Sequence, residues 1–151
     1  MNKNNKWMVM PFLIVIMFSV FLYSPKSSLA AGTAPTKIIS TAKHLIGTPY
    51  HYGGESPRGF DCSGFVNYVF KQNGISLTRS SSTLWVSGGI RVSEPMPGDI
   101  LFFNTNGSSV SHVGIYIGNN EFVHSASGGV QISCLSEKYY RHTYVGSKRF
   151  L

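Results

Sequence analysis

The sequence predicts an α+β fold in which N-terminal helices pack against an antiparallel β-sheet. Before Gly88, apolar residues recur at the spacing of a helix face. Beyond Gly88 the apolar period changes to two, as expected for strands with one buried face. Turn-forming pairs at Asn106-Gly107, Asn119-Asn120 and Gly128-Gly129 separate these later segments. Such short connections join antiparallel neighbours.

Residues 1–30 have the pattern of a secretory signal peptide. Two lysines precede an almost unbroken apolar run, Met8–Tyr23, and Ser28 and Ala30 are small residues at the spacing of a cleavage site. A retained membrane anchor is the alternative, but the run is shorter than the ~20 residues of a spanning helix. We therefore expect cleavage after Ala30, no stable membrane insertion afterwards, and export to the periplasm, the cell wall or the exterior. Residues 31–151 then form a single domain.

The charge of the exported part argues against some partners. The signal segment removes three lysines, which lowers the formal net charge from +7 to +4. The remaining Lys and Arg residues form no cluster, so we expect no nucleic-acid partner. Mild basicity suits a carboxylate-bearing cell-wall polymer, or is simply a solvated surface. We expect a monomer.

Three helices are predicted ahead of the strands. Residues 34–47 carry apolar residues at helical spacing, with a proline suited to the first turn and a glycine at the end. Residues 48–60 are rich in glycine and proline and are predicted to form a loop. Residues 61–73 again keep helical spacing and are followed by a glycine, and residues 80–87 form a short third helix.

The predicted strands are "DILFF", "SHVGIYIG", "EFVHSA", "GVQIS" and "YVGSKRFL". In the second of these, aliphatic residues occupy one face, while His112, Gly114 and Tyr116 occupy the other. In the third, His124 shares a face with Phe122. Because imidazoles on half-buried strands need polar partners, each histidine is the obvious partner of the other.

The hairpin that joins these two strands decides whether the histidines meet. A regular two-residue turn at Asn119-Asn120 would pair Ile115 with His124 and place the histidines on opposite faces. One extra residue, or a one-residue bulge, would pair Tyr116 with His124 and place His112 on the same face as His124. A site that uses both histidines therefore requires an irregular hairpin.

Cys62 admits four interpretations: a core thiol, a metal ligand, half of a disulfide, or a nucleophile. Asp61 is a good N-cap, so Cys62 falls in the first turn of a helix, where unpaired N–H groups lower the pKa of a thiol. Cys134 ends a strand and is predicted to be a small packing residue, although a Cys62–Cys134 disulfide stays possible. A zinc site from Cys62, His112 and His124 is a further alternative. No metal-binding sequence cluster supports it, and we expect neither metal nor cofactor.

Four successive stretches, "PYHYGGESPRGFDCSGFV", "PGDILFF", "SHVGIYIG" and "FVHSAS", resemble the motifs of the NlpC-type family of papain-like cysteine peptidases. These are bacterial enzymes that cut peptidoglycan stem peptides. The resemblance extends from about Thr41 to the end of the chain. It implies a papain-like α+β fold for residues 31–151 and a cysteine endopeptidase whose substrate is the peptidoglycan stem peptide. The first expected bond is D-glutamyl to diamino acid, and a cross-bridge is the second.

The resemblance also implies roles for individual residues. Cys62 is the nucleophile, His112 the general base, and His124 the residue that orients His112. The Tyr50 hydroxyl and the Cys62 backbone N–H stabilise the tetrahedral oxyanion. The implied substrate-binding residues are Asp61, Ser63, Arg79 and Ser80.

The amino terminus of a trimmed stem peptide is expected to bind Asp61. The stretch "LTRSSSTLW" departs from the family, whose members commonly carry a proline before the arginine and a glutamine after it. In the free enzyme we expect Cys62 and His112 to form a thiolate–imidazolium pair. Two functional alternatives remain: a non-catalytic peptidoglycan-binding module, and a secreted amidase of the same fold that acts on another substrate.

Overall fold

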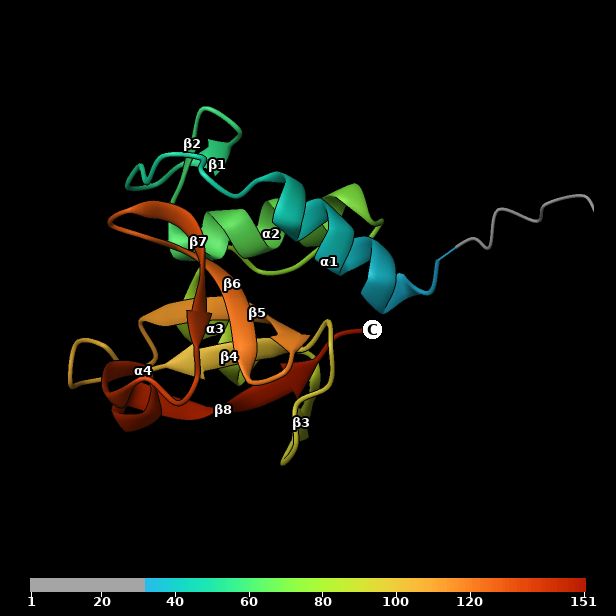
Figure 1. The fold of residues 1–151 in the computed structure, drawn as a ribbon. Helices are drawn as coiled ribbons and strands as arrows, with labels where there is room; N and C mark the ends of the chain where they lie inside the picture. The colour runs from blue at the N-terminus through green and yellow to red at the C-terminus, as the bar shows by residue number, and fades with distance from the viewer. Residues whose placement is uncertain (1–31) are drawn as a thin grey trace, which may run out of the picture. The chain divides into compact units, whose positions relative to one another are not determined.

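The computed structural model describes residues 32–151, so the predicted signal segment lies outside the described residues. Within them, helices pack on both faces of a six-stranded antiparallel sheet (Figure 1). The helices are α1 (Ala34–His44), α2 (Cys62–Gln72), α3 (Ser81–Val86) and α4 (Lys138–Thr143). The strands, in their order across the sheet, are β3 (Ile90–Val92), β8 (Tyr144–Arg149), β4 (Ile100–Phe103), β5 (His112–Gly118), β6 (Glu121–Ala126) and β7 (Gly129–Cys134). The predicted α+β fold class is confirmed.

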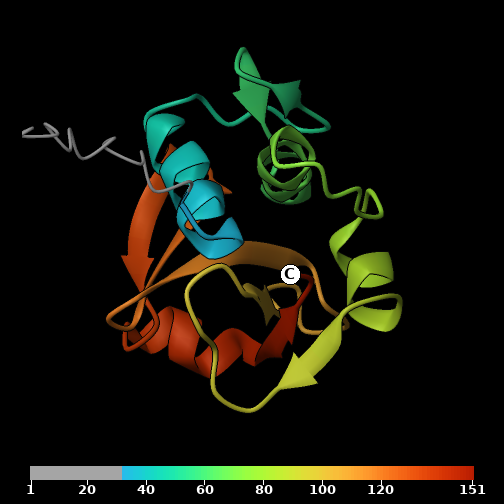
Figure 2. The same ribbon diagram turned by 90° about the vertical axis from the view of Figure 1, so that its right-hand side faces the viewer.

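The two faces of the sheet are buried by different elements. The larger core lies between the sheet and α1, α2 and α3, and it contains Ile38, Phe65, Leu84, Phe102 and Val113. Figure 2 shows α1 and α2 lying side by side over this face. On the opposite face, Leu101, Phe103 and Phe122 pack against Tyr140 of α4. The even-numbered positions of β5 and β6, which carry both histidines, belong to this second face.

Most predicted elements are confirmed, and four were missed. A two-stranded sheet, β1 (Glu55–Ser56) with β2 (Gly59–Phe60), lies inside the segment predicted to be a loop. Strand β3 is too short and too exposed to show an alternating pattern. Helix α4 was missed because only Tyr140 of its six residues is buried, which leaves no apolar spacing to detect. None of the helices in the described segment is both long and apolar enough to cross a membrane.

The β5–β6 hairpin is irregular, as the two-histidine site requires. Gly118 pairs with Glu121 across a turn in which Asn119 and Asn120 both have positive φ. The register then shifts by one residue. The predicted irregularity is confirmed, and it places the two histidines on one face.

The predicted partner of His124 was wrong. Tyr116 pairs with Phe122, and Gly114 is the residue that lies against His124. A Cβ added at Gly114 would stand 2.6 Å from the Phe122 ring and 3.1 Å from the His124 Cβ atom. The glycine therefore provides the room that the histidine pair occupies.

The loop before α2 is fastened to the first turn of that helix. The Asp61 N–H donates to the Gly54 carbonyl oxygen at 3.1 Å, and a Cβ on Gly64 would overlap that same oxygen. Earlier in the loop, the His51 N–H donates to the Phe60 carbonyl oxygen at 3.0 Å. The loop backbone and the helix start are therefore held in direct contact.

Substituting Gly64 with alanine is expected to lower the free energy of unfolding by about 2–3 kcal/mol, because backbone must move to admit the methyl group. This cost exceeds the gain of about 1 kcal/mol that alanine brings to a helix interior. Gly128→Ala is the matched control, since its Cβ would meet only the end of the Gln131 side chain. Urea unfolding of both variants measures the difference, and equal stabilities would contradict the close contact.

Candidate active site

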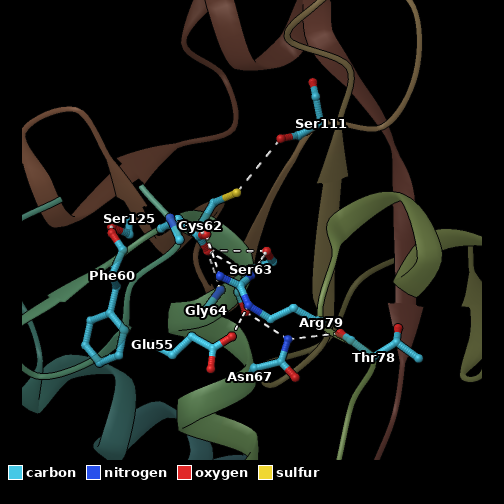
Figure 3. Close-up of polar contacts among 12 residues, drawn as sticks. Glu55, Phe60, Cys62, Ser63, Gly64, Asn67, Thr78, Arg79, Ser111 and Ser125 are labelled. Atoms are coloured by element: carbon cyan, nitrogen blue, oxygen red, sulfur yellow. Dashed lines mark hydrogen bonds and ion pairs between the residues drawn. The ribbon is translucent and has the colours of Figure 1, made fainter. Parts of the chain in front are cut away.

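Cys62 begins α2, and its thiol lies against the backbone on both sides of His112. The Asp61 side chain caps the helix by accepting a hydrogen bond from the Gly64 N–H at 2.6 Å, which confirms the predicted N-cap. The Cys62 thiol points to the Ser111 carbonyl oxygen at 3.9 Å (Figure 3). The Val113 N–H is close enough to the sulfur to lower the pKa of the thiol. Strand β5 thus brings His112 beside the tip of α2.

His112 and His124 form the predicted pair. The Nε2 atom of His112 is 2.9 Å from the Nδ1 atom of His124, and the two rings are perpendicular. His124 is fully buried and packs against the rings of Phe122 and Tyr140, which also contact each other. Its ring is therefore held in an aromatic cluster.

The far side of the His124 ring contacts two hydroxyl groups. The Ser133 Oγ atom is 3.0 Å from His124 Nε2, and the Tyr140 hydroxyl oxygen is 3.4 Å from the same nitrogen. Ser133 lies on β7 and Tyr140 on α4, so the sheet and the short helix meet at this ring. Neither residue was predicted as part of the site.

A pocket of about 520 Å³ brings Cys62 and His112 together with Tyr50. Tyr50 stands at its rim with 40% of its surface exposed. The remaining wall comes from the β4–β5 loop, the end of β6 and α4: Thr105, Ser111, Ser125, Ala126, Ser127, Tyr139 and Tyr140. The pocket thus contains the predicted nucleophile, base and oxyanion donor, while His124 stands behind the base.

Arg79 joins the predicted substrate-binding residues into one cluster. Its guanidinium donates to both Asp61 carboxylate oxygens, at 2.6 Å and 3.2 Å, and to Ser63 Oγ at 2.8 Å. Its Nε–H donates to the Glu55 carboxylate, a partner that the sequence did not reveal. Figure 3 shows this cluster beside the start of α2, with the Cys62 thiol directed away from it.

Ser80 lies apart from the cluster. Its hydroxyl caps α3 by accepting a hydrogen bond from the Thr83 N–H at 3.2 Å, and it does not line the pocket of Cys62. Of the four groove residues, the structure therefore brings together Asp61, Ser63 and Arg79.

Burial decides the protonation of the two reactive groups. It lowers the pKa of His112 to about 4. For Cys62, burial and then the Asp61 carboxylate raise the thiol pKa, and the N–H groups of Val113, Ser63 and Cys62 only partly oppose them. Both shifts favour the neutral thiol and the neutral imidazole over the expected thiolate–imidazolium pair, because the helix tip does not offset the loss of solvation.

The Asp61 carboxylate behaves differently. Burial raises its pKa, but hydrogen bonds from Arg79 and from the Gly64 and Gly53 N–H groups outweigh burial and lower the pKa overall. Asp61 thus stays negatively charged beside the pocket.

The histidine pair makes the fold sensitive to mild acid. The pKa of His112 is about 4 and that of His124, lowered by burial and then by His112, is about 3, whereas an unfolded histidine titrates near 6.5. Between pH 6.5 and 4 the unfolded chain binds more protons, so stability falls as pH falls. For His112 alone we expect a loss of about 3 kcal/mol in the free energy of unfolding by pH 4.

Urea unfolding at several pH values between 7 and 4 measures this loss. His112→Gln is expected to remove about half of the pH dependence, because His124 remains buried with a lowered pKa. His44→Gln, which changes an exposed helical histidine, is expected to leave it as in the wild type. A dependence in His112→Gln as steep as that of the wild type would contradict the buried neutral imidazole of His112.

The structure does not support the two alternative interpretations of the cysteines, a disulfide and a zinc site. Both thiols are free, so Cys62 and Cys134 form no disulfide in the structure. Within residues 32–151, no three His, Cys, Asp or Glu side chains are grouped to hold a metal ion. The geometry explains this for the zinc alternative, because His112 and His124 direct a nitrogen at each other.

Cys134 ends β7 as predicted, but it is not an apolar packing residue. Its sulfur lies 2.9 Å from Ser136 Oγ and accepts a hydrogen bond from the Asn120 amide at 3.5 Å. This thiol therefore sits in a polar, partly exposed environment.

Ser133 could have been found from strand parity. Gln131 pairs with His124, so Ser133, two residues further along β7, shares the His124 face. Tyr140 could not have been found from the sequence, because α4 itself was not predicted.

Comparison with known proteins identifies the fold and the family. The model of the NlpC/P60 family matches residues 47–149. The chain is 48% identical over 115 residues to a probable peptidoglycan endopeptidase, LytE, of Bacillus subtilis, covering 76% of this chain and 34% of that protein. It is 43% identical over 123 residues to a gamma-DL-glutamyl hydrolase of the same organism, covering 78% of this chain and 30% of that protein. The chain thus spans about a third of the length of these relatives.

Solved structures support the same family assignment. An NlpC/P60 family protein from Bacillus cereus superposes with a TM-score of 0.72 at 35% identity, over 78% of this chain and 40% of that one. The NlpC/p60 domain of the peptidoglycan hydrolase SagA superposes with a TM-score of 0.65 at 31% identity, over 76% of this chain and 97% of that one. The fold, the matched segment and these identities together show that the chain belongs to the NlpC/P60 family.

Proposed function

We propose that the protein is a cysteine peptidase that hydrolyses peptide bonds in peptidoglycan stem peptides. The observation that carries the proposal is a thiol at the tip of α2, held against the backbone around His112, with His112 paired to His124 in turn. Family membership and the name of the LytE relative support the same substrate.

The neutral pair suggests how the reaction begins. His112 Nε2 faces His124, which leaves Nδ1 to take the Cys62 proton as the sulfur attacks the substrate carbonyl. The tetrahedral intermediate collapses when His112 returns this proton to the leaving amine, and an acyl-enzyme remains. Water, deprotonated by His112, then releases the carboxylic acid and restores the thiol.

The oxyanion needs two donors, and Tyr50 and the Cys62 N–H supply them in this proposal. Burial, followed by the nearby Cys62 and Asp61, raises the pKa of Tyr50, which keeps its hydroxyl protonated and able to donate. Tyr50 lines the same pocket as Cys62, which supports the assignment.

We propose the bond between D-glutamate and the diamino acid as the site of cleavage. The cluster of Glu55, Arg79 and Asp61 has two carboxylates for one guanidinium, so its excess negative charge favours the ammonium group of a trimmed stem peptide. Ser63 holds Arg79 in this cluster. In this proposal Ser80 supports α3 rather than substrate.

Digestion of purified muropeptides, with products identified by mass spectrometry, tests the proposal. We expect fragments that end in glutamate and fragments that begin with the diamino acid, and faster cleavage of stems with a free amino terminus than of stems still attached to the glycan. Binding to peptidoglycan without new amino termini would instead indicate a non-catalytic module.

A second candidate follows from the gamma-DL-glutamyl hydrolase relative. A γ-linked glutamyl polymer presents the same kind of amide outside peptidoglycan, which corresponds to an amidase of this fold acting on another substrate. Parallel digestion of such a polymer distinguishes the two. Preferential release of glutamyl oligomers would displace the peptidoglycan proposal.

We also propose that the chain is exported and acts as a monomer outside the cytoplasm. The basis is the signal pattern of residues 1–30. Cell fractionation with amino-terminal sequencing tests export and cleavage after Ala30, and light scattering on the purified protein tests the monomer.

A further inference from the structure

We propose that Ser133 and Tyr140 are positioning residues that fix the tautomers of His124 and His112, so that His112 offers an unprotonated Nδ1 to the thiol. The inference rests on the proposed role of His112 as general base. It extends the site by two hydroxyl groups, from β7 and from α4, behind the histidine pair.

The hydroxyls reach His124 in a place that is closed to water. His124 is fully buried, and Ser133 and Tyr140 are only 8% and 9% exposed. The aromatic rings of Phe122 and Tyr140 both pack against the imidazole. Because a buried polar nitrogen must find its partner within the protein, His124 Nε2 depends on these two hydroxyls.

The pair of histidines leaves only two consistent arrangements of protons. A neutral imidazole carries one N–H, and His112 Nε2 and His124 Nδ1 share one hydrogen bond. If His124 donates from Nδ1, then His112 carries its own proton on Nδ1 and cannot accept one from Cys62. If His112 donates from Nε2, its Nδ1 is free to act as a base. Catalysis needs the second arrangement.

The second arrangement requires an acceptor at the far end of the pair. With Nδ1 accepting, the proton of His124 sits on Nε2 and must be donated, and Ser133 Oγ at 3.0 Å is the nearest oxygen. The Tyr140 hydroxyl oxygen, 3.4 Å from the same nitrogen, is the second oxygen that can accept this proton.

Tyr140 connects the histidine pair to the pocket. Its hydroxyl oxygen is 3.4 Å from His124 Nε2, and Tyr140 lines the same pocket as Cys62 and His112. The Tyr140 proton can therefore be directed to the pocket, while its oxygen accepts from His124. His112 and His124 then both donate from Nε2, in the direction of the two hydroxyl oxygens.

The tautomers can be read directly from the imidazole nitrogen chemical shifts of the ¹⁵N-labelled protein. In the wild type we expect protonated Nε2 and unprotonated Nδ1 in both His112 and His124. Ser133→Ala and Tyr140→Phe are expected to mix the two tautomers. Each should also lower kcat on a defined stem peptide by about tenfold to a hundredfold, by analogy with groups that orient metal-binding histidines.

Three comparisons separate positioning from packing. Ser133→Thr keeps the hydroxyl and is expected to restore both the tautomers and most of kcat. Because the residues act as one unit, Ser133→Ala combined with Tyr140→Phe should be little worse than the poorer single variant. Ser147→Ala and Tyr144→Phe, which remove hydroxyls that do not contact His124, should match the wild type.

Reversed tautomers in the wild type, or unchanged tautomers in Ser133→Ala, would overturn the inference whatever the activity. A fall in kcat with unchanged tautomers would assign the loss to packing and overturn it as well. The spectra do not depend on turnover, so an inactive wild-type protein would refute the proposed function while leaving this test intact.

Discussion

Replacing Cys62 with serine is expected to lower kcat/KM on a stem peptide by about 10⁴-fold or more, with the fold intact. The pKa of His112 is about 4, so this imidazole is a weak base. It can assist a thiol, but a serine hydroxyl holds its proton far more tightly. Single-turnover assays on a defined stem peptide measure the loss of activity, and thermal unfolding measures whether the fold is intact.

Cys134→Ser is the matched control, since the same change is made to a thiol outside the pocket. We expect it to retain wild-type activity. Substantial hydrolysis by Cys62→Ser would rule out Cys62 as the nucleophile. A loss of activity in Cys134→Ser alone would indicate that Cys134, not Cys62, is the nucleophile.

His112→Ala is expected to lower kcat/KM by about 10²–10⁴-fold, because in the proposed mechanism it removes the group that both accepts and returns the proton. His124→Ala should cost less, since His124 is proposed to act through the ring of His112. His124→Asn and His124→Gln keep a hydrogen-bonding group near His112 Nε2 and should retain the most activity. The measurement is kcat/KM for all four variants on one defined stem peptide.

Two outcomes would change the assignment of roles. If His124→Ala matched the wild type, His124 would be structural and the site would be a Cys-His dyad. If it fell to the level of His112→Ala, the two histidines would act as one unit, and single substitutions could not separate them.

The helices and the site strands could be predicted because their signals are local. Asp61 before Cys62 is an N-cap pattern, and alternation in β5 and β6 assigns His112 and His124 to faces from the sequence alone. The need for an irregular hairpin followed from strand parity once both histidines were required on one face. The position of the irregularity could not be predicted, because a bulge in β5 and an extra residue in the turn satisfy the same parity.

The parts that failed depend on three-dimensional context. A helix tip predicted a thiolate at Cys62, but the sequence could not show that burial and Asp61 together oppose it. Tyr140 was missed because a single buried residue in a polar segment gives no periodic signal. Glu55 was missed because its link to Arg79 joins positions 24 residues apart.

The contact between the Gly54 carbonyl and the first turn of α2 bears on how substrate can enter. The segment that carries Tyr50 is bonded at Gly54 to Asp61 and at His51 to Phe60, and the Thr48 carbonyl accepts the Val130 N–H of β7 at 2.8 Å. A segment tied to a helix and to a strand cannot swing as a lid without breaking both. The rim at Tyr50 is therefore preorganised, and the oxyanion donor proposed there would be in place before the substrate arrives.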